Sequence, residues 1–144
     1  MANFKVTLHG LDEFRANMRG LANDMADVLE DATTKGAVVV VKAAKENSQK
    51  GGYSYPHRIT GNLMRSIGPP VTVTKTRERV EVAVGSSMEY ARRLEQGFIG
   101  MDSRGRYYHQ GPRSFLRPAL DENTDQIEAA VRARLMQIIE RYAR

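Results

Sequence analysis

The hydrophobic positions near the start of the chain change their spacing after the tenth residue. Between Phe4 and Leu8, apolar and polar side chains alternate, which predicts a short strand with one buried face. Gly10 interrupts this alternation, and the apolar residues that follow are three or four positions apart. These residues are Leu11, Phe14, Met18, Leu21, Met25, Val28 and Ala32. The spacing predicts an amphipathic helix, which we expect to pack against the sheet rather than to form a coiled coil.

The next segment, from Gly36 to Lys45, has features of both a strand and a helix. The valines at 38–41 favour a strand, but the residues that follow them are strong helix formers. We therefore expect a single long helix that continues to this point and bends near Gly36. The polar, glycine-rich residues after it predict a loop over 47–59.

Two runs of alternating valines predict an antiparallel hairpin. The runs cover 71–76 and 80–84. Ser86 and Glu89 follow with the spacing of a capping box, so a short helix is expected to begin there. Gly97 should end this helix.

The last third of the chain contains one ambiguous segment and one clear helical pattern. Residues 98–113 could form a second hairpin that turns at 102–105, or a long mobile loop. Pro118 suits the first turn of a helix, and apolar residues then recur at helical spacing to the chain end. These residues are Leu120, Ile127, Val131, Leu135, Ile138 and Tyr142.

Taken in order, these elements predict an α+β fold. We expect one domain over residues 1–144, with a small antiparallel β-sheet packed against a long N-terminal helix and a C-terminal helix. Two extended segments, 47–59 and 98–113, should remain as loops or as a loop and a hairpin.

Composition narrows the classes of function. The 144 residues include no cysteine, which excludes disulfides, thiolate metal sites and cysteine nucleophiles. The net charge is +5 and is concentrated in residues 51–120, which hold eleven basic side chains, ten of them arginine, and five acidic ones. Arginine suits bidentate pairing with carboxylate or phosphate at an interface. The sequence shows no signal peptide and no apolar run near the ~20 residues of a membrane span, so we expect a soluble, intracellular protein.

The sequence offers little that could support catalysis. His9, His57 and His109 are far apart and form no pair with metal-ligand spacing. Nucleophile-elbow, phosphate-loop and dinucleotide-binding motifs are all missing. A dyad of Asp102 and His109 across the second hairpin is the strongest catalytic candidate, and we reject it because nothing else in the sequence supports it. We therefore expect no enzymatic activity, no cofactor and no metal.

The segment Arg104–His109 interleaves arginine with aromatic residues. This pattern suits stacking on bases together with phosphate contacts, and it suits a protein interface equally well. A basic DNA-binding protein is therefore the alternative to an assembly component. Strong weakening of binding by salt would distinguish the two.

Three short motifs, in a fixed order, carry a resemblance to a known family. They are Thr60–Ile67, Tyr90–Gly97 and Pro112–Leu120, and the opening Gly10–Phe14 also fits. Together they resemble the neck or tail-completion proteins of long-tailed double-stranded-DNA bacteriophages, the head–tail joining group found in lambdoid phages and prophages. Family members usually continue Glu-x-Gly-Thr at the second motif, whereas this chain reads Glu95-Gln96-Gly97-Phe98. The resemblance therefore does not predict the conformation of the turn after Gly97.

The resemblance implies a structural, non-enzymatic virion component that is made in the cytoplasm of the host bacterium. Such a protein would join or complete the head–tail junction as a ring around the DNA channel. Its partners would be further copies of itself and other head–tail junction and tail proteins, with non-specific contact to packaged DNA as an option. A closed ring requires each subunit to present two different, complementary patches. Segments 47–59 and 98–113 are candidates to become ordered only on assembly.

Two groups of residues carry these expectations. The expected assembly interface consists of Arg92, Arg93, Arg104, Arg106, Tyr107, Tyr108 and Arg113. The motif residues expected to support the scaffold are Thr60, Gly61, Asn62, Leu63, Ser66, Ile67, Tyr90, Ala91, Glu95, Gly97, Phe115, Leu116, Pro118 and Ala119.

Overall fold

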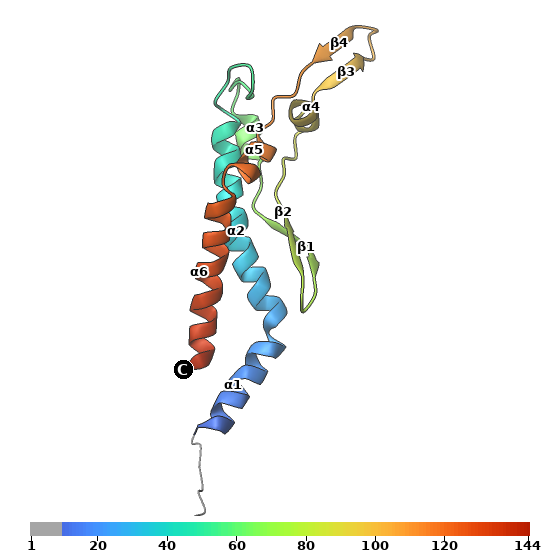
Figure 1. Ribbon diagram of the computed structural model, residues 1–144. Coiled ribbons are helices and arrows are strands. Elements are labelled where there is room, and N and C mark those ends of the chain that lie inside the picture. Colours follow the sequence, from blue (N-terminus) through green and yellow to red (C-terminus); the bar gives the residue numbers. More distant parts are fainter. Residues whose placement is uncertain (1–9) are drawn as a thin grey trace, which may run out of the picture.

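Two long antiparallel helices run along the molecule in the computed structural model, which describes residues 10–144. Helices α2 (Met25–Asn47) and α6 (Thr124–Ala143) lie side by side (Figure 1). Gly36 permits their close approach, because a Cβ atom at this position would lie only 2.6 Å from Cγ2 of Val131. An ion pair between Asp31 and Arg134, 2.5 Å long, fastens the same two helices.

The predicted N-terminal helix is interrupted where no break was expected. Helix α1 (Leu11–Asn23) ends before Asp24 and α2 begins at Met25, so the single long helix expected here is wrong; Gly36 lies inside the continuous helix α2. Asp24 accepts a hydrogen bond of 2.7 Å from the Tyr142 hydroxyl, which ties the break to the end of α6. The expected strand Phe4–Leu8 lies outside the described residues.

The apolar face of α1 and early α2 packs on α6. Leu21 and Val28 form a small buried cluster with Ile138 of α6. The prediction that this face packs against the sheet is therefore wrong. The reason is that the hairpin contacts α2 through the polar residues Asp27 and Glu30, whereas the apolar residues of the same stretch face α6.

The first predicted hairpin is confirmed. Strands β1 (Val71–Lys75) and β2 (Val80–Ala83) pair antiparallel and pack on α2. Lys75 reaches both Asp27 and Glu30 of α2, and Thr72 donates a hydrogen bond of 2.6 Å to Glu30. Hydrogen bonding from Lys75 lowers the pKa of Glu30, and the two acids raise the pKa of Lys75. Polar contacts on the helix flank thus hold this hairpin.

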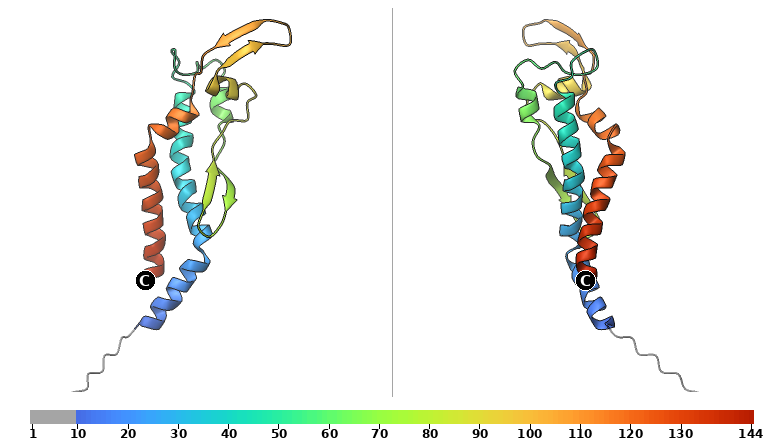
Figure 2. Two further views of the ribbon diagram at one scale, coloured as in Figure 1. Left: turned by 45° about the vertical axis from the view of Figure 1, so that its right-hand side comes forward. Right: turned by 90° about the vertical axis from the view of Figure 1, so that its left-hand side faces the viewer.

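The remaining elements gather where α2 ends. They are the short helices α3 (Asn62–Ser66), α4 (Ala91–Gln96) and α5 (Leu116–Asp121), and strands β3 (Phe98–Met101) and β4 (Tyr107–Gln110). β3 and β4 form a second antiparallel hairpin, so the hairpin alternative for residues 98–113 is correct. The two hairpins form separate sheets, and the second projects away from the helices (Figure 2). The predicted α+β class is confirmed.

Two predicted helix boundaries are wrong. The Ser86–Glu89 pattern does not start a helix: Ser86 accepts a bond of 3.2 Å from the Met88 amide, but α4 begins only at Ala91. The single C-terminal helix expected from Pro118 is instead α5 and α6, separated at 122–123. The side chain of Asn123 donates to the carbonyl of Ala119 there (2.9 Å), a local bond that competes with helix continuation.

The larger of the two cores lies at the junction of α2, α3, α4 and α5. Phe115, with 0% exposure, is its largest fully buried side chain. The buried members are Val40, Ala44, Leu63, Ile67, Ala91, Phe115 and Ala119. Among the described residues, no helix is long and apolar enough to cross a membrane.

Candidate assembly interface

The three motifs, far apart in the sequence, meet at the larger core. Leu63 and Ile67 come from the first motif, Ala91 from the second, and Phe115 and Ala119 from the third. All five are buried against the C-terminal part of α2. The motifs therefore build one continuous support at this end of the molecule.

Glu95 links the second motif to the third through hydrogen bonds. Its carboxylate accepts three bonds from backbone amides at the start of α5: from Phe115 (2.9 Å), Leu116 (3.0 Å) and Arg117 (2.8 Å). These amides are the donors that a helix N-terminus leaves without partners inside the helix, and a negative charge there is favourable. Its backbone carbonyl also accepts a bond of 2.8 Å from the Ser114 hydroxyl. Glu95 thus fixes the position of α5 relative to α4.

The first motif is held in a similar way. The amide of Asn62 donates to the Thr60 hydroxyl (3.3 Å), and Gly61 takes a positive φ of 76° just before α3. The Ser66 hydroxyl lies 2.6 Å from that of Ser86, beside an isolated bridge between the Ile67 and Ser86 backbones. This contact joins the first motif to the segment after β2.

The third motif is also anchored to α2. The buried side chain of Asn47, the last residue of α2, donates a hydrogen bond of 3.2 Å to the carbonyl of Phe115. Leu116 lies half-buried against the core, and Pro118 occupies the first turns of α5. The support therefore includes the end of the longest helix.

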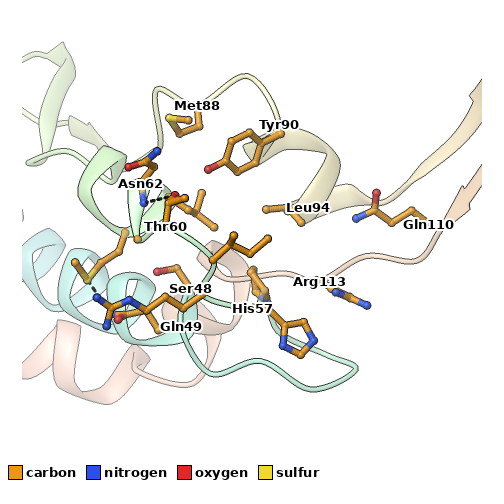
Figure 3. A pocket seen from close by; sticks show the side chains of 16 residues that line it. Ser48, Gln49, His57, Thr60, Asn62, Met88, Tyr90, Leu94, Gln110 and Arg113 are labelled. Carbon is orange, nitrogen blue, oxygen red and sulfur yellow. Dashed lines mark hydrogen bonds between the residues drawn. The ribbon is translucent and has the colours of Figure 1, made fainter. Parts of the chain in front are cut away.

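A cavity of about 500 Å³ lies between the motifs (Figure 3). Thr60 and Asn62 line one part of it, and Tyr90 and Leu94 of the second motif line another. Arg113 stands at its edge, half-buried. In the part of the chain that the structure describes, no group of three His, Cys, Asp or Glu side chains could hold a metal ion.

The β3–β4 hairpin carries an exposed apolar face. Met101 pairs with Tyr107 and Ile99 with His109, and residues directly opposite each other share a face of the ribbon. On this face, Ile99 is 65% exposed, Met101 69% and Tyr107 67%. We call these three residues the hairpin face. Nothing in residues 10–144 covers it.

The opposite face of the same hairpin holds arginine–aromatic contacts. The guanidinium of Arg93 lies 4.4 Å from the centre of the Phe98 ring, and that of Arg106 lies 6.0 Å from the centre of the Tyr108 ring. The Phe98 and Tyr108 rings are 6.4 Å apart. These contacts fix the angle between α4 and the hairpin, with Gly97 allowing the turn between them at φ 79°.

The expected interface residues therefore fall into separate places. Arg93, Arg106 and Tyr108 lie together on one side of the hairpin, whereas Tyr107 lies on the other. Arg92 is exposed on α4, where it donates to Gln96 (3.3 Å). Arg104 is exposed in the β3–β4 turn, and Arg113 borders the cavity.

Asp102 organises the β3–β4 turn. It accepts hydrogen bonds from the amides of Arg104 and Arg106, both 2.9 Å, from Arg106 Nε (2.9 Å) and from the Tyr108 hydroxyl (3.3 Å). His109 lies on the face opposite Tyr108, so these contacts assign Asp102 to the turn rather than to a dyad with His109. The backbone amide of Arg106 is the main cause that lowers the pKa of Asp102.

We predict that acid loosens this turn. Since the folded-state pKa of Asp102 lies below its ordinary value of 3.8, its contribution to stability is present above that value. The contribution is lost as the pH falls through the lowered pKa. Backbone chemical shifts of Arg104 and Arg106 should therefore move as the pH is lowered from about 6 to about 2. In Asp102→Asn they should start displaced and move little, and equal titration in both proteins would contradict the prediction.

Sequence reasoning missed two features of this region. The hairpin face includes Ile99 and Met101, which were not among the expected interface residues. The sequence shows no alternation of apolar and polar residues there, because Phe98 on the opposite face is also apolar. The second feature is the role of Glu95 as the cap of α5, for which the sequence holds no local signal because the capped amides are about twenty residues away.

Comparison with known families identifies the relationship. Residues 12–97 match the family described as "Bacteriophage HK97-gp10, putative tail-component". The match covers more than half of the chain and includes the first two motifs; the β4 strand and the third motif follow it. No curated protein and no solved structure matches the chain. The described family is a structural one, part of the phage tail, and the chain belongs to this HK97-gp10-like family of bacteriophage tail components.

Proposed function

We propose that the protein joins or completes the head–tail junction of the phage particle, where copies of it assemble as a ring around the DNA channel. Membership in a family of phage tail components supports a structural role in the virion. The hairpin face is the single observation that carries the assembly part of the proposal. It is apolar, exposed and held away from the rest of the chain.

The physical argument rests on the low stability of an isolated hairpin. A two-stranded ribbon is marginally stable alone in water and needs packing against another element. Here one face is supported by the arginine–aromatic contacts with α4, and the other face exposes Ile99, Met101 and Tyr107. Exposed apolar patches mark interaction sites, and tyrosine and arginine are enriched among the residues that dominate binding. A neighbouring subunit would complete the packing of the hairpin.

The basic middle of the chain supports a position beside the DNA channel. Arg92, Arg104 and Arg113 belong to the segment with eleven basic and five acidic side chains. Arginine binds phosphate without reading base sequence. We therefore place transient, non-specific DNA contact within the assembled ring. The structural role carries no catalytic step, no cofactor and no metal.

Exchange of Arg92 and Arg93 for glutamate tests the proposal. We expect Arg92→Glu/Arg93→Glu to block head–tail joining, because it reverses the charge beside the hairpin and removes the contact with Phe98. The helical circular dichroism should be unchanged, since both side chains are exposed. Joined virions should be counted by electron microscopy after complementation of a phage that lacks the gene.

A matched control distinguishes an effect of the location of Arg92 and Arg93 from an effect of the change in net charge. Arg132→Glu/Arg141→Glu makes the same change in net charge on the exposed surface of α6. This control should still support joining. Normal joining by the Arg92→Glu/Arg93→Glu protein would contradict the proposal.

A further inference from the structure

An apolar groove lies on the body of the molecule, at a distance from the hairpin face. It has a volume of about 500 Å³ and is bounded by α2, β2, α5 and α6. Its principal apolar residues are Ala37, Val40, Val82, Val84, Leu120 and Ile127. Leu120 at its rim is 52% exposed. We call this surface the body groove.

The hairpin face of the same chain does not occupy this groove. β3 and β4 run outward from α4 and away from the α2–α6 pair in both views (Figures 1 and 2). The hairpin is held in that direction by Arg93 on Phe98 and by the bond of 2.7 Å from the Arg113 amide to the Leu94 carbonyl. A hairpin that fills the groove must therefore come from another copy.

The charges around the two surfaces are complementary. The hairpin turn carries Arg104 and Arg106, and among the described residues Arg104 forms no ion pair. Beside the groove, residues 117–131 contain four acidic side chains and one basic one, Arg117, which lines the groove and pairs with Asp121 (3.6 Å). These acids are Asp121, Glu122, Asp125 and Glu128, all exposed. Opposite charges around apolar centres favour this orientation over like-to-like contact.

We propose that the hairpin face of one subunit docks into the body groove of a second copy. This inference rests on the proposed self-assembly and names the two surfaces that it uses. The contact is heterologous, because it joins two different patches, so each subunit can bind one neighbour on each side. Repetition of the contact generates a ring when the rotation closes.

Disulfide crosslinking in virions tests the contact. The chain has no cysteine of its own, so Met101→Cys/Leu120→Cys introduces one thiol on each surface. Oxidised virions should give a ladder of bands at multiples of 16.1 kDa that collapses on reduction. The matched control is Met101→Cys/Met136→Cys, because Met136 is exposed on α6 but does not line the groove. No ladder, or an equal ladder from the control, overturns the proposal.

Crosslinking also distinguishes the hairpin face from a second segment that could occupy the body groove. A ladder from Val6→Cys/Leu120→Cys, with none from Met101→Cys/Leu120→Cys, would assign the groove to residues 4–8 of a neighbour and overturn the docking proposal.

Glutamate variants give an independent readout. Met101→Glu and Leu120→Glu each place a charge on an exposed side chain of one surface, so folding should be preserved while joined virions fall at least roughly tenfold. Met136→Glu should have no such effect. Failure of the two proposals can be separated: if loss of the gene leaves virions joined, the proposed function fails. If loss of the gene separates heads from tails but no ladder forms, only the docking contact fails.

Discussion

Replacement of Phe115 by alanine should lower the free energy of unfolding by about 3–5 kcal/mol, the range for truncating a buried phenylalanine. The side chain is fully buried where the three motifs and α2 meet, so little of the resulting cavity can be filled by rearrangement. Urea unfolding followed by circular dichroism measures the change. The loss should appear in the unfolding midpoint with an unchanged slope.

Phe14→Ala provides the matched control. Phe14 lies on α1 and is 55% exposed, so the same truncation should cost less than about 1 kcal/mol. Similar losses in both variants would show that Phe115 is not the centre of the core.

Replacement of Glu95 by alanine should be the second largest loss, about 2–3 kcal/mol, since hydrogen bonds to a charged group contribute about 1.5–3 kcal/mol and are not additive. The change leaves three amides at the start of α5 without their acceptor. Glu95→Gln keeps an acceptor oxygen but not the charge. Its free energy of unfolding should therefore lie between those of the unchanged protein and of Glu95→Ala. Thermal or urea unfolding measures the series.

Glu89→Ala is the control for Glu95. Glu89 is the acidic residue that the sequence pattern selected as a capping residue, yet it is exposed and α4 begins after it. We expect its removal to change stability by less than about 0.5 kcal/mol. Equal effects at positions 89 and 95 would contradict the capping role of Glu95.

Local patterns were sufficient where neighbouring residues determine the structure. The alternating valines predicted β1 and β2, and the sequence predicted helical structure over α1, α2 and α6 but not the break between α1 and α2. The break at Asp24 was not predicted because the apolar spacing continues across it, from Leu21 to Met25 and Val28. At Gly36 the missing side chain allows α6 to approach, because a Cβ atom there would lie only 2.6 Å from Cγ2 of Val131. That requirement comes from a residue 95 positions later and is invisible in the local sequence.

The relative placement of the motifs could not be predicted from the residues either, because it depends on contacts between residues that are far apart in the sequence. Asn47 and Phe115 are 68 positions apart, and their hydrogen bond depends on how the whole chain folds. Glu95 belonged to a recognised motif, but the helix that it caps begins about twenty residues later. The arginines of the expected interface were identified by composition, which gives the charge of a segment but not the side of an element on which each side chain lies. Only the strand register separates Tyr107 from Tyr108 and reveals the hairpin face.

The most direct test of the head–tail joining role is a stop codon in this gene within the phage that carries it, with the lysate viewed by negative-stain electron microscopy. We predict DNA-filled heads beside separate or malformed tails, and restoration of joined particles when the full-length chain is supplied from a plasmid. The tail morphology would distinguish a neck position from a position at the end of the tail. Intact, joined and infectious virions in the absence of the protein would contradict the proposed role.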